Sequence, residues 1–147
     1  MLCDIFSMDF NHHPSAERYQ RYGECRNMTL IFAKDKSLES LREAIDARRT
    51  LAYSYGTLAG EESLLRKFFE ASVSVREISV DKNGRRQIIV TNNSSMEWWL
   101  VREGRKAEIL EPHSSIILGE RTTTSNTFTL VNTWCGEDKH LTVELFK

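Results

Sequence analysis

A short polar segment near the N-terminus contains the residues of this chain that are best suited to metal chemistry. The segment reads Asp9-Phe10-Asn11-His12-His13-Pro14. A carboxylate and an imidazole within a few residues can share one divalent metal, and such ligands commonly lie in the loop after a strand. Leu2 to Phe6 is a candidate strand in that position. We take Asp9 and His12 as candidate ligands, with further ligands needed from elsewhere; the alternative is a solvated loop.

Other patterns with catalytic potential favour structural roles. The sequence contains no G-x-S-x-G nucleophile elbow, no phosphate-binding glycine loop and no H-E-x-x-H helix. Glu61 and Glu62 are consecutive at an expected helix start, where acidic side chains favour the helix dipole, so we prefer that role to an acid–base pair. His113 and His140 lie far apart in the sequence near turns, and we expect both at the surface. A self-contained classical hydrolase is therefore not indicated.

Composition and charge exclude some classes of partner. The 147 residues are 40% hydrophobic and have a formal net charge of -1, so no general field attracts nucleic acid or an anionic membrane. The largest basic cluster, Arg85 and Arg86 beside Lys82, lies in an expected hairpin tip, and we interpret it as a solvated turn. Met1 to Phe10 lacks the pattern of a secretory signal, and no window approaches the ~20 apolar residues of a membrane helix. The sequence does not indicate a compartment.

The expected secondary structure changes near Val75, from a mixture of helices and strands to strands and turns. Between residue 28 and that position the sequence predicts two strands and two helices. The helix after Ser37 is capped by that serine, and its apolar residues recur every three or four positions. A strand, helix and strand in this order most simply form a right-handed parallel crossover. The expected elements are Met28 to Ala33, a helix from Leu38, Thr50 to Tyr55, and a helix from Glu61 to Ala71.

The second expected helix places a row of large apolar residues on one face. These residues are Leu64, Leu65, Phe68 and Phe69. The phenylalanines could belong to a cofactor pocket, but packing against a large core is the simpler interpretation of this spacing.

After Val75 the apolar residues alternate, as in strands with one buried face. About seven short strands separated by turns predict an immunoglobulin-like antiparallel β-sandwich. Because Trp98 and Trp99 are adjacent, they must point to opposite faces of a strand. We therefore expect one in the core and one partly outside, in preference to a carbohydrate platform formed with Trp134. The expected strands are Val75 to Val80, Gln87 to Thr91, Met96 to Arg102, Ala107 to Leu110, Ser115 to Leu118, Thr127 to Asn132 and Leu141 to Phe146.

The first half of the chain resembles the last segment of the PHP (polymerase and histidinol phosphatase) superfamily, over about residues 8 to 72. The resemblance rests on Asp9 to Pro14, Arg26 to Lys34, Ser37 to Ala44 and Arg48 to Thr50. It implies a distorted β/α barrel that binds up to three ions of zinc, manganese or iron, which activate water against a phosphoester. The resemblance also implies a late Asp-x-His metal motif. Asp9 matches its Asp, but Asn11 stands where the His belongs and His12 follows one position later.

The resemblance implies that the remaining metal ligands come from earlier barrel strands. We therefore expect residues 1–147 alone to be inert toward phosphoesters. The predicted fold is α+β, with residues 1–73 as a short α/β remnant of a β/α barrel and residues 74–147 as the immunoglobulin-like sandwich.

Two functions follow from this reading. The chain is either the C-terminal region of a metal-dependent phosphoesterase that needs a missing barrel segment, or a non-enzymatic module that binds protein or glycan. Because the strand from Met28 to Ala33 would need cover for its edges, we also expect homo-oligomers.

Overall fold

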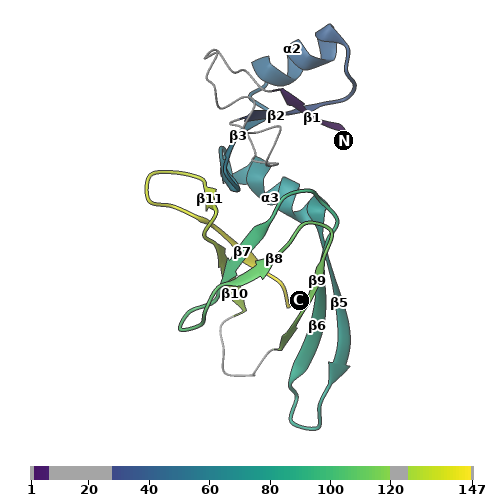
Figure 1. The fold of residues 1–147 in the computed structure, drawn as a ribbon, viewed down its shortest axis with the longest axis vertical. Helices are drawn as coiled ribbons and strands as arrows, with labels where there is room; N and C mark the ends of the chain where they lie inside the picture. The colour runs from purple at the N-terminus through teal and green to yellow at the C-terminus, as the bar shows by residue number, and fades with distance from the viewer. Residues whose placement is uncertain (1, 7–27, 120–125, 147) are drawn as a thin grey trace, which may run out of the picture.

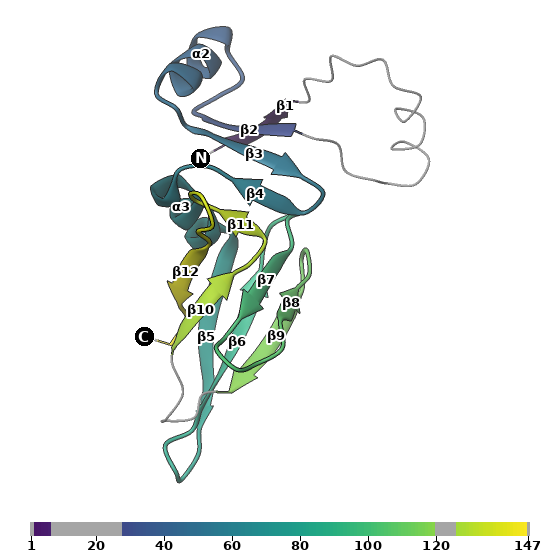
Figure 2. The ribbon, with the colours of Figure 1, turned by 90° about the vertical axis from the view of Figure 1, so that its left-hand side faces the viewer.

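The computed structural model describes residues 2–6, 28–119 and 126–146, and side chains in the latter two ranges. Within them the chain is an α+β protein dominated by strands, as predicted, with two helices. The molecule is elongated, with α2 and β1 near one end and the tip of the β5–β6 hairpin at the other (Figures 1 and 2). Neither of these helices is long and apolar enough to span a bilayer.

The elements in chain order are β1 (Leu2–Phe6), β2 (Met28–Ala33), α2 (Leu38–Asp46), β3 (Thr50–Ser54), β4 (Thr57–Ala59), α3 (Glu62–Ser72), β5 (Val73–Val80), β6 (Arg86–Asn92), β7 (Trp98–Val101), β8 (Glu108–Leu110), β9 (Ser115–Gly119), β10 (Thr127–Leu130), β11 (Thr133–Trp134) and β12 (Leu141–Glu144).

A five-stranded sheet organises the first part of the chain. Its order is β1-β2-β3-β4-β11, and every pair is antiparallel except β4 with β11. The strand predicted over Leu2 to Phe6 is confirmed as β1. It pairs with β2 on one side, while β3 pairs on the other, so both edges of β2 are hydrogen-bonded. The premise that this strand needs cover for open edges is therefore wrong, although oligomer formation itself stays a prediction.

The predicted parallel crossover between β2 and β3 is also wrong. The two strands are antiparallel, with Ile31 opposite Thr50 and Met28 opposite Tyr53. The nine-residue α2 rises only about 14 Å, whereas the six residues of β2 span about 20 Å. The helix is thus too short to return the chain to the start of β2, and β3 begins beside the end of β2 instead. The bond from Phe32 N to Arg49 O, 2.9 Å long, closes this junction.

Helix α2 begins as the sequence predicts but buries less than its pattern suggests. Ser37 is the N-cap, and its hydroxyl accepts a hydrogen bond from Ser40 N at 3.2 Å. Of the apolar positions only Ala44 is buried, whereas Leu38 is 75% exposed and Ile45 52% exposed. The helix contacts the sheet chiefly through β2, so its outer apolar positions face solvent.

Helix α3 joins the front sheet to the β-rich part of the chain. The rings of Phe68 and Phe69 lie 5.6 and 5.1 Å from the Trp98 ring, and Phe68 also meets Phe32 at 5.4 Å. The predicted packing of these phenylalanines against a large core is confirmed, and one hydrophobic cluster extends from Leu30 to Phe146 across the predicted boundary at residue 73. The division into two domains stays a prediction.

Two further sheets form the rest of the chain. One has the order β12-β10-β7-β8 and the other β5-β6-β9, so seven strands are present here, as predicted. Their inward residues alternate with exposed ones and meet in the shared cluster, for example Leu100 and Leu130 with Ile88 and Val90. This is the layering expected of a sandwich. The immunoglobulin-like topology stays a prediction.

Candidate functional site

The predicted metal ligands Asp9 and His12 lie outside the residues that the structure describes. The strand that precedes them, β1, is described, and its last residue, Phe6, pairs with Thr29 near the start of β2. Figure 2 shows these two strand ends together at one side of the sheet. The segment from 7 to 27, which contains both candidate ligands, therefore connects two neighbouring strands.

No metal centre is formed by residues 28–119 and 126–146. Nowhere in these ranges do three or more His, Cys, Asp or Glu side chains gather. His113 lies at the surface, as expected, and its Nε2 is 3.4 Å from Ser95 Oγ. His140 is half-buried, because its ring lies 4.2 Å from that of Trp134 and its Nδ1 is 2.7 Å from Thr133 O. The residues in these ranges do not fit a metal cluster.

The three tryptophans do not form one carbohydrate platform. Trp98 is completely buried, whereas Trp99 is 39% exposed on the opposite face of β7, as the sequence predicts. Trp99 pairs with the exposed Ile109 of β8. Trp134 belongs to another sheet, where it stacks on His140.

The acidic pair at the start of α3 has a structural role, in agreement with the sequence. Glu62 accepts hydrogen bonds from Lys139 Nζ at 2.7 Å and from Arg66 Nη2 at 3.0 Å. These bonds, with the Lys139 bond contributing most, lower the pKa of Glu62, and the same carboxylate raises the pKa of Lys139. Glu61 Oε1 accepts from Ser63 Oγ at 2.6 Å. Glu62 therefore fastens α3 to the residues before β12, whereas the Glu61 bond is local to the start of α3.

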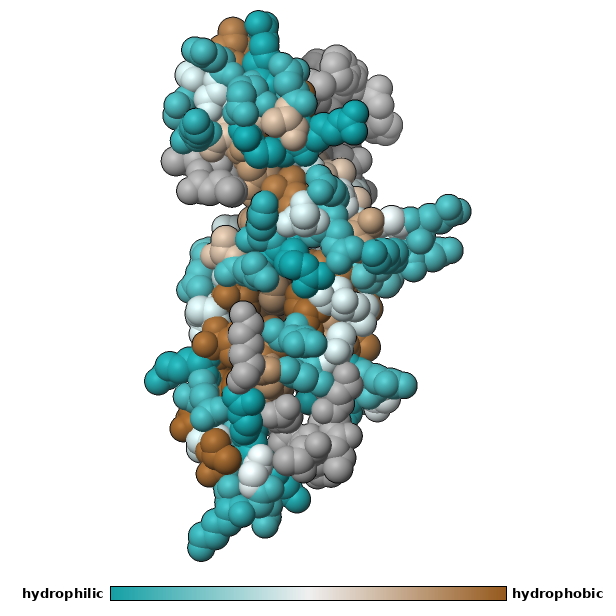
Figure 3. Space-filling view, turned by 180° about the vertical axis from the view of Figure 1, so that it is seen from behind, coloured by the Kyte–Doolittle hydropathy of each residue, from teal (hydrophilic) through white to brown (hydrophobic). Residues whose placement is uncertain are grey.

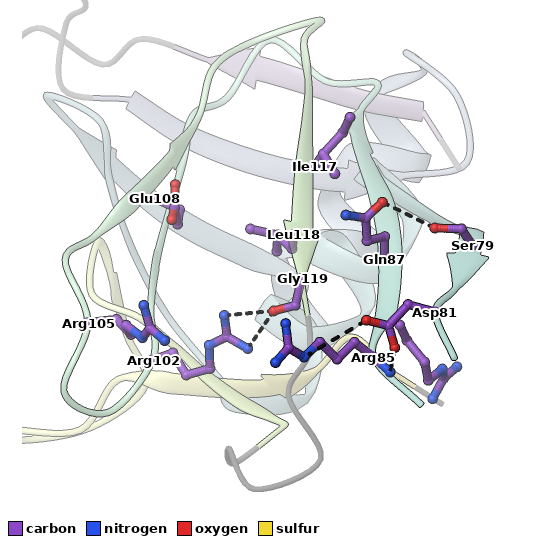
Figure 4. Close-up of a pocket in the computed structure, with 11 residues that line it drawn as sticks. Ser79, Asp81, Arg85, Gln87, Arg102, Arg105, Glu108, Ile117, Leu118 and Gly119 are labelled. Atoms are coloured by element: carbon purple, nitrogen blue, oxygen red, sulfur yellow. Dashed lines mark hydrogen bonds and ion pairs between the residues drawn. The ribbon is translucent and has the colours of Figure 1, made fainter. Parts of the chain in front are cut away.

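An arginine-rich pocket of about 540 Å³ lies at the opposite end of the molecule from α2. Four arginines line it, together with Asp81 and Glu108. Figure 4 shows Arg85 and Arg102 extending toward the Gly119 carbonyl from two sides. We call this the arginine pocket; its arginines are Arg85, Arg86, Arg102 and Arg105.

The fold brings the four arginines together from two hairpins. Arg85 and Arg86 follow the turn at Gly84, whose φ is +73°, while Arg102 and Arg105 flank the turn at Gly104 with φ +69°. The sequence suggested only a solvated turn at Arg85 and Arg86. It missed the pocket because no local pattern shows that the β7–β8 turn lies beside the β5–β6 hairpin.

Comparison with known proteins gives one informative similarity. No protein-family model and no curated protein matches the chain. Among solved structures, the chain is similar to a two-domain protein from Bacteroides vulgatus ATCC 8482 described as containing a predicted PHP-like metal-dependent phosphoesterase. The TM-score is 0.76 and the identity 30%, over 86% of this chain and 40% of that one. The chain thus spans less than half the length of that neighbour. The similarity agrees with the family suggested by the sequence.

Proposed function

We propose that this chain is the C-terminal region of a PHP-type metal-dependent phosphoesterase. The observation that supports the proposal best is the 30% identity and TM-score of 0.76 to a protein described as PHP-like. The candidate motif of that family, with Asp9 and His12, lies outside the described residues. In this proposal those side chains supply a carboxylate and an imidazole, which suit zinc, manganese or iron.

The remaining ligands come from outside the chain, from a barrel segment or from a partner. Within residues 28–119 and 126–146 no cluster supplies them. A site with only two protein ligands leaves a phosphoester unpositioned, so the chain alone is inert toward such substrates. In the completed site, Asp9 and His12 would help to hold a metal that would polarise the phosphoester and lower the pKa of bound water.

A calorimetric titration tests this proposal. Protein stripped of metal with EDTA is titrated with Mn²⁺ and Zn²⁺, beside an Asp9→Ala/His12→Ala variant. The matched control is Asp46→Ala/His113→Ala, which also removes one carboxylate and one imidazole. Binding that disappears only in the first variant supports the proposal. Binding that all three proteins share, or that none shows, contradicts it.

A second candidate function is a non-enzymatic module that binds protein or glycan. The observation that favours it is the partly exposed Trp99 beside Ile109 on the outer face of the four-stranded sheet. An exposed indole next to an aliphatic side chain suits the apolar face of a sugar ring. A titration with neutral hexasaccharides, followed by tryptophan fluorescence in the wild type and in Trp99→Ala, tests it. An unchanged spectrum in the wild type contradicts the binding of glycan.

Homo-oligomer formation is a separate proposal. Strand β5 lies at the edge of its sheet, and its residues Val75, Ile78 and Val80 are between 40% and 54% exposed. Figure 3 shows hydrophobic surface near the end of the molecule that contains the β5–β6 hairpin. An exposed apolar edge strand favours pairing with a second copy. A strictly monomeric mass in light scattering contradicts this proposal.

A further inference from the structure

The arginine pocket contains more positive than negative charge, and its arginines differ in how they are paired. Arg86 donates to Glu77 at 2.8 Å, and Arg85 lies 3.9 Å from Asp81. For Arg102 and Arg105, no carboxylate partner occurs in the part of the chain that the structure describes. Two guanidinium groups of the pocket therefore retain full charge without a counter-ion there.

Arg102 is held in place while using only part of its hydrogen-bonding capacity. Its guanidinium carbon lies 5.0 Å from the centre of the Phe128 ring, a cation–π arrangement that fixes the plane of the group. Both Nη atoms donate to one acceptor, Gly119 O, at 3.3 Å. Its buried Nε has no hydrogen-bond partner among the described residues. Each Nη carries a second N–H beyond the one directed at Gly119 O, so the guanidinium can still donate to an additional acceptor.

The negative groups of the pocket do not neutralise it. Asp81 Oδ1 accepts from the backbone N–H groups of Asn83 and Arg85, at 2.8 and 2.9 Å, and so serves the hairpin turn. Glu108 lies apart from Gly119 in Figure 4. The Gly119 carbonyl already accepts from Arg102. An anion entering between Arg102 and Arg105 would meet N–H groups that have no acceptor among the described residues.

We propose that the arginine pocket binds a phosphate group, either free phosphate or the phosphate of a small phosphomonoester. Arginine forks donate paired hydrogen bonds to tetrahedral oxyanions, and several guanidinium groups match an ion of charge −2 better than a singly charged carboxylate. The volume of about 540 Å³ exceeds that of a phosphate ion and leaves room for an esterified group beside the exposed Ile117. The site uses no metal and does not depend on the proposed phosphoesterase activity.

The test is a calorimetric titration at low salt in the presence of EDTA. The EDTA removes metal ions, so that phosphate bound to a metal does not contribute to the signal. Inorganic phosphate, phenyl phosphate and acetate are titrated separately into the full chain. We expect saturable binding of a phosphate species that is at least ten-fold tighter than acetate and that weakens as salt increases. Binding of phenyl phosphate in preference to phosphate identifies the ester as the ligand, and the reverse identifies the free ion.

Three variants locate the site. Arg102→Gln and Arg105→Gln should each weaken phosphate binding at least ten-fold, whereas Arg42→Gln on α2 should leave it unchanged. Arg105 is exposed, so its variant tests the pocket even if the contact of Arg102 with Phe128 proves necessary for folding. Absence of phosphate binding, equal binding of acetate, or an equal loss in Arg42→Gln would overturn the proposal.

Discussion

Asn132 donates a hydrogen bond from Nδ2 to the carbonyl oxygen of Gly56, 76 residues earlier in the chain, at 2.9 Å. The same amide donates to Glu97 O at 2.9 Å, and its Oδ1 accepts from Trp99 N at 3.0 Å. One buried side chain thus joins the β3–β4 turn of the five-stranded sheet to β7 of the four-stranded sheet.

Replacement of Asn132 by alanine should therefore weaken the whole structure. Each buried polar group left without a partner costs about 1–3 kcal/mol, so we expect Asn132→Ala to lower the free energy of unfolding by at least about 2 kcal/mol. Asn93→Ala is the matched control, because Asn93 is exposed, and should change stability by less than about 0.5 kcal/mol. Urea unfolding measures both. Equal effects of the two substitutions would contradict the role of Asn132.

The adjacent tryptophans offer a second comparison. Trp98 is fully buried against Phe68 and Phe69, whereas Trp99 is partly exposed. Trp98→Ala should cost about 3–5 kcal/mol of unfolding free energy, and Trp99→Ala about 1 kcal/mol. Thermal and urea unfolding of the two variants decide the matter. A larger cost for Trp99→Ala would mean that the faces of β7 are reversed.

The Glu62–Lys139 pair predicts a dependence of stability on pH. Since the pKa of Glu62 is lowered in the folded state, its contribution is present above its unfolded pKa and is lost as the pH falls through the folded pKa. The raised pKa of Lys139 acts at the alkaline end, where its contribution is lost as the pH rises through the folded value. In Lys139→Gln the pKa of Glu62 should rise toward its ordinary value, as measured by NMR titration of the carboxyl carbon. Lys67→Gln should leave it unchanged; if it causes the same rise, the pairing is incorrect.

Gly60 is required by close packing. A β-carbon at this position would lie 2.4 Å from Leu51 Cδ2 and 3.3 Å from Thr50 O. We expect Gly60→Ala to lower the unfolding free energy by about 1–3 kcal/mol. At Gly136 the added carbon would make only ordinary contact, 3.5 Å from Lys139 Cβ, so Gly136→Ala serves as the control in the same thermal melts. A neutral Gly60→Ala would show that the junction between β4 and α3, or the Leu51 side chain, adjusts readily.

The sequence predicts the local elements well and their long-range pairing poorly. Ser37 marks the start of α2, and β2 is bounded by Met28 and Ala33 as expected, because both signals are local. Strand β11 has only two residues and pairs in parallel with β4, so no periodicity reveals it. The apolar spacing of α2 predicts burial of Leu38, but burial depends on a neighbouring surface that spacing does not encode.

The two candidate sites also differ in how far the sequence predicts them. The polar run around Asp9 and His12 stands out in the sequence, but it lies outside the described residues, so its role stays a prediction. The arginine pocket joins residues of two hairpins, such as Arg85 and Arg102, which are 17 positions apart, and is visible only once β7 and β9 are placed beside the β5–β6 hairpin.

The central claim is that the chain retains part of a phosphoesterase metal site. Elemental mass spectrometry of the protein as purified tests it most directly, with the Asp9→Ala/His12→Ala variant purified in parallel. We predict that the wild type contains zinc, manganese or iron well above the variant, in proportion to protein. Equal metal content in the two proteins, or none in either, would contradict the claim and direct attention to the surface around Trp99.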